Sequence, residues 1–338
     1  MSDPSALPAP RRRVFLLGPT GSIGEATARA LVGRGHDVVA FARPRSGVGG
    51  RLTPDALAAR LPGAQWRFGD ATDPVSLARD GFRGERFDAV VSCLASRTGA
   101  PRDAWRIDHQ AHLYALAAAQ DVGVRQFVLL SAICVQKPLL AFQKAKLAFE
   151  AALIESGLTY SIVRPTAFFK SLSGQVERVR NGKPFLMFGD GALTACKPIS
   201  DDDLAAFLAD CVTDEARANR ILPIGGPGPA ITPRQQGERL FELLGRPPRF
   251  SRAPVGLLDV VIAALSALGK LSPRLAEKAE LARIGRYYAT ESMLVWDTAA
   301  RRYDAEATPS TGFQTLFDYY GQLLRGEATL ERGDHAVF

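Results

Sequence analysis

A glycine-rich turn joins a short apolar run to a helical pattern near the start of the chain. The run RVFLLG ends at Gly18, and helical spacing follows from Ser22 to a glycine stop. Gly18 allows a tight turn, Gly21 lets the backbone approach a pyrophosphate, and Gly24 lets the helix lie close to the sheet. Such a helix also presents free N–H groups and the positive end of its dipole to the phosphates. Three glycines alone are a weak signal, but the strand before them and the helix after them predict a dinucleotide-binding turn. The residues expected to contact the dinucleotide here are Gly18, Thr20, Gly21, Ser22, Ile23 and Gly24.

The first half of the chain alternates strand and helix patterns, which favours a parallel sheet with helices on both faces. Helices are predicted over residues 103–120 and 138–155, and a late strand is predicted over residues 220–228. Ser200 is expected to cap the helix that follows it. The other predicted strands read DVVAFARP, AQWRFGDATD, FDAVVSCLA, QFVLLSA and TYSIVRP. The fold class is therefore α/β, with a doubly wound parallel sheet of the Rossmann type.

The length of 338 residues is enough for one sizeable core and a second lobe. We expect a flexible tail over residues 1–12 and a dinucleotide-binding domain over residues 13–225, in which residues 166–200 contribute to the substrate side. Residues 226–330 are expected to form a smaller, mainly helical C-terminal substrate lobe. Because no repeat or low-complexity linker separates the two parts, they are expected to share one interface.

The charge of the chain limits the classes of partner. A charged fraction of 23% is ordinary for a soluble globular protein. The net charge of +7 fits either a mildly basic surface or attraction to an anionic ligand or membrane face. Because the positive charge is not clustered, no nucleic-acid partner is expected. The first residues lack an apolar stretch, so no signal peptide is expected either. The sequence does not indicate an oligomeric state.

The cysteines and histidines do not form a metal-binding pattern, and no metal site is predicted. The four cysteines are Cys93, Cys134, Cys196 and Cys211. They include no CxxC pair and stand in apolar surroundings, so reduced core thiols of a cytoplasmic protein are expected. His109 and His112 are three residues apart, but no third ligand accompanies them.

The end of the second predicted strand indicates which dinucleotide is preferred. It reads FARPRS, with Arg43 and Arg45 and without the acidic residue that usually accepts hydrogen bonds from the ribose of NAD. Arg43 can pair with a 2′-phosphate, so NADPH is favoured over NADH. Asp70, after the third strand, is expected either to reach the adenine amino group or to cap a helix.

The carboxyl ends of the later strands are expected to border the cofactor, because open α/β sheets bind ligands there. Ser131 ends the fifth predicted strand and is expected to touch the nicotinamide ribose or the substrate. The further residues expected beside the cofactor are Cys93, Leu94, Ala95, Pro165, Thr166, Ala167 and Phe168.

The segment SAICVQKPLLAFQKAKLAFE, residues 131–150, resembles the catalytic segment of the short-chain dehydrogenases. That segment usually carries a tyrosine, three residues and then a lysine. Lys146 is present here, but the position four residues before it is Phe142. Together with the glycine turn and the Arg-Pro pair at residues 164–165, this resembles the atypical short-chain dehydrogenases, the NmrA-like and isoflavone-reductase-like group.

A narrower resemblance covers most of the chain, from about Arg13 to Phe317. The blocks LSAICVQKPLLAFQKAKLAFE, YSIVRPTAFFKSLSGQVE, MFGDGALTACKPISDDDLAAFLADCV and YDAEATPSTGFQTLF resemble the NADPH-dependent divinyl chlorophyllide 8-vinyl reductases of chlorophyll and bacteriochlorophyll synthesis. The first residues are unlike the transit peptide of plant members, which suggests a bacterial, cytoplasmic member. A second, unrelated type of vinyl reductase uses flavin and iron–sulfur clusters, and the scattered cysteines argue against that type.

The resemblance implies that NADPH and a proton convert the ring-B vinyl group of a magnesium tetrapyrrole, a divinyl chlorophyllide or protochlorophyllide, to ethyl. A carbonyl reductase needs its tyrosine to protonate an oxygen, and a vinyl group has no such oxygen. Lys146 is then expected to hold the nicotinamide ribose and to stabilise the developing anion. Phe142 is expected either to flank the flat substrate or to pack in the core.

Three further residues are candidates for the substrate site. Phe169 offers apolar surface, and Lys170 and Lys197 offer cations, which suits a macrocycle with a propionate. Each is equally compatible with packing or with solvent exposure. A non-catalytic NADP(H)-sensing regulator of the NmrA type and a structural subunit of a larger complex are the alternative functions, and the retained lysine favours the enzyme.

The segment PVGLLDVVIAALSALGKL, residues 254–271, is almost entirely apolar. It is shorter than the roughly 20 apolar residues of a membrane span and contains Asp259. A buried helix, a wall of the substrate cavity and a peripheral contact with a photosynthetic membrane remain as alternatives.

Overall fold

The computed structural model describes residues 10–46, 50 and 53–329, so most of the predicted tail over residues 1–12 lies outside the described residues. Its centre is a seven-stranded sheet in the order β3-β2-β1-β4-β5-β6-β8, with every neighbouring pair parallel. The strands are β1 (Arg13–Leu17), β2 (Asp37–Ala42), β3 (Ala64–Phe68), β4 (Ala89–Ser92), β5 (Gln126–Leu130), β6 (Thr159–Pro165) and β8 (Arg220–Ile224). The order reverses between β1 and β4, which confirms the predicted doubly wound fold and the late strand.

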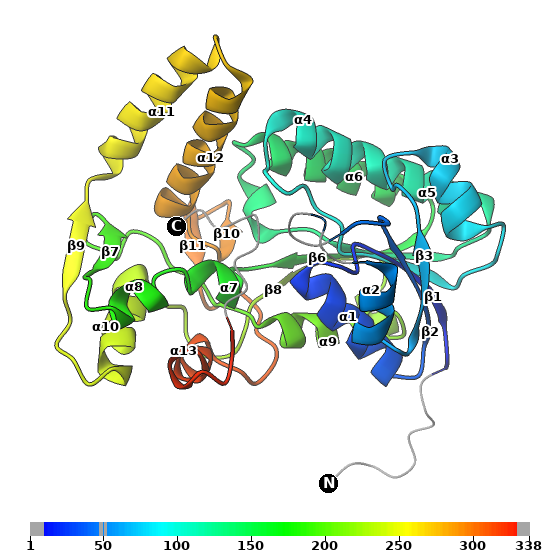
Figure 1. Cartoon of the computed structure of the whole chain (residues 1–338), viewed down its shortest axis with the longest axis horizontal. Coiled ribbons are helices and arrows are strands. Elements are labelled where there is room, and N and C mark those ends of the chain that lie inside the picture. The colour runs from blue at the N-terminus through cyan, green and yellow to red at the C-terminus, as the bar shows by residue number, and fades with distance from the viewer. Residues whose placement is uncertain (1–9, 47–49, 51–52, 330–338) are drawn as a thin grey trace, which may run out of the picture.

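Helices cover both faces of this sheet, as Figure 1 shows. The helices α1 (Ser22–Gly33) and α9 (Asp201–Asp210) pack with the β1 residues Val14 and Leu16. The opposite face carries α5 (His112–Asp121) and α6 (Ala141–Glu155), which pack with Phe15 and Leu17. Because alternate residues of a strand point to opposite faces, the continuous apolar run of β1 fills both layers of the core.

Several element boundaries differ from the sequence prediction. The helix predicted from residue 103 begins as α4 (Pro101–Ala104) and is wound as a π-helix over Trp105–Ala111 before α5. The helix predicted from residue 138 begins at Ala141, because the Gln143 side chain accepts the backbone N–H groups just before it. The predicted cap of α9 is confirmed, since Ser200 Oγ accepts from the backbone N–H of Asp203 at 3.0 Å.

The second half of the chain builds a smaller, largely helical body beside the sheet (Figure 1). Its core contains Phe169, Phe185, Leu240 and Tyr320, all buried. The body also contains two two-stranded sheets, β7 with β9 and β10 with β11. The elements of this body are α7 (Phe169–Leu172), α8 (Val176–Arg180), β7 (Phe185–Phe188), α10 (Pro233–Leu243), β9 (Phe250–Ala253), α11 (Val255–Gly269), α12 (Pro273–Thr290), β10 (Val295–Asp297), β11 (Arg302–Asp304) and α13 (Leu316–Arg325). The first half of the chain also contains α2 (Pro54–Arg60), α3 (Pro74–Ser76) and a π-helix over Leu77–Phe82, and two short 3-10 helices span Ile133–Gln136 and Glu215–Arg217.

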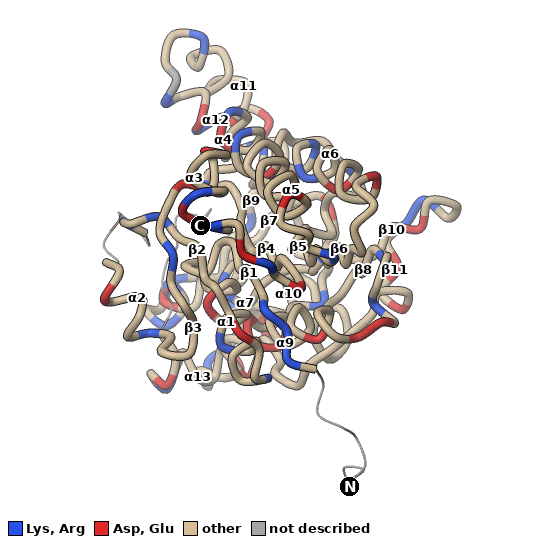
Figure 2. Tube along the Cα trace, turned by 90° about the vertical axis from the view of Figure 1, so that its right-hand side faces the viewer, with Lys and Arg blue, Asp and Glu red and all other residues tan. Residues whose placement is uncertain are grey.

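The hairpin of α11 and α12 projects from this body in both views (Figures 1 and 2). No residue of α11 is buried, and Val260 is 66% exposed, so the buried-helix interpretation of this apolar segment is wrong. Asp259 pairs with Arg286 of α12, which explains how a carboxylate is accommodated in the segment. Among the described residues, no helix is both long and apolar enough to cross a bilayer.

Candidate active site

The glycine turn has the close contacts that the sequence predicts. Gly18 has a φ of +73°, and a Cβ atom there would lie 2.7 Å from backbone atoms of Cys93 and Leu94 at the end of β4. A Cβ atom on Gly24 would lie 2.0 Å from the carbonyl oxygen of Gly18. At Gly21 the nearest such atom is 3.9 Å away. The first and third glycines are therefore required by packing, whereas the second leaves the backbone open to a ligand.

The start of α1 fits the phosphates of a dinucleotide. Gly21 is the N-cap residue, and no side chain caps the helix there. The backbone N–H groups of the first turn are therefore available to anionic oxygens, and the helix dipole favours negative charge at this end. Cys93, which faces this turn, is a poor nucleophile, because burial raises the pKa of its thiol to about 12.

A cavity of about 460 Å³ opens beside Ser22 at the start of α1. Phe169 and Lys170, predicted for the substrate, both border it. The ring of Phe169 is only 3% exposed, with its centroid 5.6 Å from that of Tyr319, so most of it serves packing. Asp201 also borders the cavity; burial raises the pKa of its carboxyl, and a hydrogen bond with Ser22 opposes that effect. The sequence did not predict this acidic residue for the site.

Lys146 is held by a buried carboxylate. Its Nζ lies 3.1 Å from Asp108 Oδ1, and the two side chains are 11% and 0% exposed. The backbone N–H of Ser96 donates to the same oxygen at 3.2 Å. Asp108 was not predicted, because an acidic residue within a helical pattern ordinarily indicates a solvent-facing position. An ammonium has three donors, so this arrangement orients Lys146 and leaves donors for a ligand.

His112 lies next to this pair and is structural. Its Nδ1 donates to the Ile107 carbonyl at 2.8 Å, so Nε2 accepts from the Ser92 hydroxyl at 2.8 Å. Burial, and then the charge of Lys146, lowers the pKa of His112 to about 4. The ring is therefore neutral at physiological pH and is unsuited to proton transfer there.

Phe142 lies between the loop after β4 and helix α12. A Cβ atom on Gly99 would lie 3.6 Å from Phe142 Cδ1 and 2.9 Å from Ile284 Cδ1. Phe142 is partly buried and packs against the core of the second half of the chain. Because Lys146 follows one turn later on α6, both residues lie where the loop after β4 approaches the C-terminal helices.

Two residues predicted for the adenosine end are exposed. Arg43 follows β2 with its side chain in solvent. Asp70 Oδ1 accepts from the backbone N–H and the hydroxyl of Thr72, both at 2.8 Å. The alternative role of Asp70 as a helix cap is wrong, because Asp73 caps α3 by accepting from Val75.

Other predicted residues already have partners. The hydroxyl of Ser131, 4% exposed, donates to the Glu150 carboxylate, so it can meet a ribose only as an acceptor. Lys197 Nζ donates to the Thr308 carbonyl at 2.9 Å, which supports packing over contact with a substrate. The remaining predicted residues lie at the carboxyl ends of β4 and β6, which stand on either side of β5, and are Cys93, Leu94, Ala95, Pro165, Thr166, Ala167 and Phe168.

Known proteins share both the fold and the sequence. Residues 18–215 match the NAD(P)H-binding family, which confirms a nicotinamide dinucleotide site. A protein of Oryza sativa subsp. indica named divinyl chlorophyllide a 8-vinyl-reductase, chloroplastic, is 54% identical over 331 residues, covering 96% of this chain and 82% of the relative. The chain belongs to the divinyl chlorophyllide a 8-vinyl-reductase family. The member of this family from Arabidopsis thaliana is 50% identical over 95% of this chain and 79% of its own length. The resemblance to this family is thereby confirmed.

Solved structures share the fold of this reductase family member. An NADPH-dependent quinone oxidoreductase of Escherichia coli, complexed with NADPH, has a TM-score of 0.64 at 18% identity and covers 92% of this chain and 99% of its own. A UDP-glucose 4-epimerase of Thermotoga maritima has a TM-score of 0.60 at 19% identity, with 71% and 85% covered. At these identities the likeness concerns the fold alone.

Proposed function

We propose that this chain uses NADPH to reduce the 8-vinyl group of a divinyl chlorophyllide or protochlorophyllide to an ethyl group. The single observation that carries this function is the 54% identity to a divinyl chlorophyllide a 8-vinyl-reductase over 82% of that relative. The glycine turn and the pair of Lys146 with Asp108 supply the parts that such a reaction requires. Residues 13–225 then bind the cofactor, and residues 226–330 contribute the substrate lobe.

Bound NADPH supplies a hydride. The open backbone at Gly21 and the start of α1 bind its phosphates. Arg43, exposed after β2, pairs with the 2′-phosphate, and Asp70 lies on the adenine side. The residues at the ends of β4 and β6 border the nicotinamide half, because they stand at the carboxyl edge of the sheet, and those after β4 lie against the glycine turn.

Lys146 acts at the nicotinamide end. Asp108 fixes one of its three donors, and the others hold the ribose hydroxyls. The same ammonium stabilises negative charge that develops in the tetrapyrrole after the vinyl group gains a hydride. Since the site is largely buried, this electrostatic effect is larger than it would be in water.

Phe142 presents an apolar ring where carbonyl reductases have a phenol. A vinyl group has no oxygen to protonate, so a hydroxyl is not needed at this position. The exposed part of the Phe142 ring can then lie against the flat macrocycle. Lys170 is the better of the two lysine candidates for the substrate propionate, because it borders a cavity, whereas Lys197 is bonded to the Thr308 carbonyl. The magnesium ion belongs to the substrate.

The projecting hairpin of α11 and α12 is the proposed site of peripheral contact with an anionic photosynthetic membrane. Its apolar residues Leu257 and Val260 are 51% and 66% exposed. Lys270, Arg274 and Lys278 are exposed at its outer end, and Figure 2 shows basic residues on this projection. Exposed apolar side chains next to basic residues favour the interface of a bilayer with anionic lipids. The proposed location, the cytoplasm of a bacterium, then includes a peripheral contact with the membrane surface.

The optical assay of the purified protein tests the proposed reaction. NADPH and a divinyl chlorophyllide are mixed with the protein, and a blue shift of the Soret band is expected as conjugation shortens. Binding of NADPH without any spectral change would contradict the enzymatic function and would favour a regulator that senses NADP(H).

A further inference from the structure

Tyr288 places a phenol on the helix that packs beside Phe142. Phe142 occupies the position at which short-chain dehydrogenases usually have their tyrosine. Tyr288 lies on α12 one turn after Ile284, whose Cδ1 approaches Gly99 together with Phe142 Cδ1. Residues four apart share a helix face, so the face of α12 that packs beside Phe142 also carries Tyr288. Figure 1 shows α12 descending to the region between the sheet and the C-terminal strands.

The Tyr288 hydroxyl lies at the inner end of its side chain. It is 4.0 Å from Cys134 Sγ, in the turn that follows β5. Cys134 is 1% exposed, whereas Tyr288 is 41% exposed. The hydroxyl therefore lies beside a buried thiol, while part of the Tyr288 side chain remains exposed.

The charge of Lys146, on α6, acts on the pKa of the same thiol. Burial raises the pKa of Cys134, and the side chains of Gln143 and Tyr288 and the charge of Lys146 act in the opposite direction. Cys134, which lies beside the Tyr288 hydroxyl, stands in the turn that follows β5, at the carboxyl edge of the sheet. This edge is where open α/β sheets bind their ligands.

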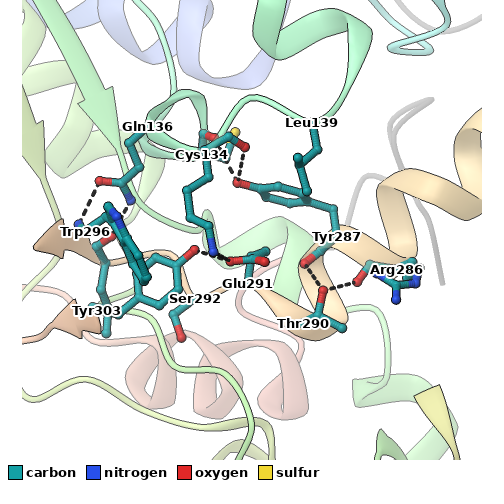
Figure 3. Close-up of polar contacts among 12 residues, drawn as sticks. Cys134, Gln136, Leu139, Arg286, Tyr287, Thr290, Glu291, Ser292, Trp296 and Tyr303 are labelled. Atoms are coloured by element: carbon teal, nitrogen blue, oxygen red, sulfur yellow. Dashed lines mark hydrogen bonds and ion pairs between the residues drawn. The ribbon is translucent and has the colours of Figure 1, made fainter. Parts of the chain in front are cut away.

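The end of α12 is fixed on the turn after β5, as Figure 3 shows. The neighbouring Tyr287 donates to the carbonyls of Cys134 at 2.9 Å and of Lys137 at 3.2 Å. Lys137 pairs with Glu291, and its Nζ lies 4.4 Å from the centre of the Trp296 ring. This network positions α12, and Tyr288 with it, against the site.

We propose that Tyr288 is the proton donor of the vinyl reduction; this inference rests on the proposed function. When the hydride supplied by NADPH forms a C–H bond at the terminal vinyl carbon, the π electron pair moves to the inner carbon and into the macrocycle. The Tyr288 O–H bond then breaks, and its proton forms the second C–H bond at the inner carbon. The phenolate regains a proton from water, so the products are the ethyl group, NADP⁺ and the restored phenol.

The surroundings favour Tyr288 over Cys134 as the donor. Cys134 is almost completely buried, whereas part of the Tyr288 side chain is exposed. Burial, and then the neighbouring Cys134, raises the pKa of Tyr288 well above its usual value. The phenol is therefore protonated at neutral pH.

The adjacent tyrosines provide a matched pair of variants. Tyr288→Phe keeps the ring and removes the proton, so turnover should fall by roughly a hundredfold to ten-thousandfold, the usual contribution of a general acid. Its dissociation constant for NADPH, measured by fluorescence, should stay within about twofold of wild type, because no cofactor role is assigned to it. Tyr287→Phe should lower the melting temperature, since it removes a buried donor to two carbonyls, but should keep most of the turnover.

The product formed in deuterated water gives a readout besides rate. Wild type should place deuterium at the inner ethyl carbon in one configuration, because Tyr288 delivers it to one face. Residual product of Tyr288→Phe should contain both configurations, since water then supplies the proton. Fluorotyrosine at position 288 is a stronger acid of similar size. It should move the alkaline limb of the pH–rate profile to lower pH, while Cys134, Tyr287 and Lys146 are left unsubstituted.

The outcomes separate the two proposals. A wild-type protein that binds NADPH but does not reduce the divinyl substrate would overturn the proposed function and the role of Tyr288 with it. An active wild type whose Tyr288→Phe variant turns over at the same rate, or gives product of the same single configuration, would overturn the role of Tyr288 alone. If Tyr288→Phe folds poorly, the fluorotyrosine variant decides. A pH–rate profile with the same alkaline limb as wild type would then overturn the role of Tyr288.

Discussion

Replacing Lys146 by methionine should damage both folding and turnover, and the structure separates the two effects. The ammonium lies 3.1 Å from Asp108 Oδ1, and both side chains are nearly or fully buried. Removing one partner of a buried ion pair leaves the other charge unpaired, which typically costs about 3–5 kcal/mol of the free energy of unfolding. Coulomb's law at this distance with an effective dielectric constant of about 20 gives an attraction of about 5 kcal/mol, of the same order. Turnover should fall by roughly a hundredfold to a thousandfold, the effect of removing one positioned electrostatic donor.

A second substitution tests the origin of each loss. Asp108→Asn in the Lys146→Met background removes the unpaired charge, so most of the lost stability should return. Turnover should stay low, because the ammonium is still absent. Urea unfolding measures the first quantity, and the Soret shift under single-turnover conditions measures the second.

Two results would refute this reasoning. If the double variant is no more stable than Lys146→Met, the ion pair does not account for the loss in folding. If Lys146→Met turns over at the wild-type rate while folded, the ammonium neither holds the ribose nor stabilises an anion.

Three further predictions follow from the placement of other residues. Arg43→Ala should raise the KM for NADPH by roughly tenfold to a hundredfold, since a charged hydrogen bond contributes about 1.5–3 kcal/mol. The KM for NADH should stay unchanged, and an equal rise for both cofactors would argue against a phosphate contact. Phe142→Tyr should bring no gain in turnover, because no carbonyl oxygen needs a proton, and a variant several times faster than wild type would be inconsistent with that account. Val260→Asp should weaken sedimentation with phosphatidylglycerol vesicles, whereas Val75→Asp, at a position 62% exposed outside the hairpin, should not; equal binding of both variants would rule out the hairpin as the membrane contact.

The parts of the fold that local patterns determine could be predicted from the sequence. The strand β6, Thr159–Pro165, matches the predicted TYSIVRP, because the apolar run ends there in a proline, which lacks the backbone N–H that would continue the strand pairing. The turn from Gly18 to Gly24 was predictable from the glycine spacing, and the structure shows a steric requirement at Gly18 and Gly24. The start of α6 was not predicted, because it depends on how the Gln143 side chain bonds to the preceding backbone.

The tertiary parts of the site could not be predicted in this way. Asp108 reaches Lys146, and Tyr288 reaches Cys134, from separate helices, and no local spacing connects the partners. The sequence left the exposure of α11 undecided, because an apolar run has the same pattern whether it packs inside a protein or projects from it. Asp70 and Asp73 are both plausible helix caps by residue type, and only the backbone geometry selects Asp73.

Deuteride transfer from labelled NADPH to a divinyl chlorophyllide tests the central claim most directly. The account predicts an ethyl product that carries deuterium at its terminal carbon, formed together with an equal amount of NADP⁺. Hydride addition at that carbon lets the charge spread into the macrocycle, where Lys146 stabilises it. Deuterium found only at the inner carbon, or NADPH that is bound but never oxidised, would contradict the account.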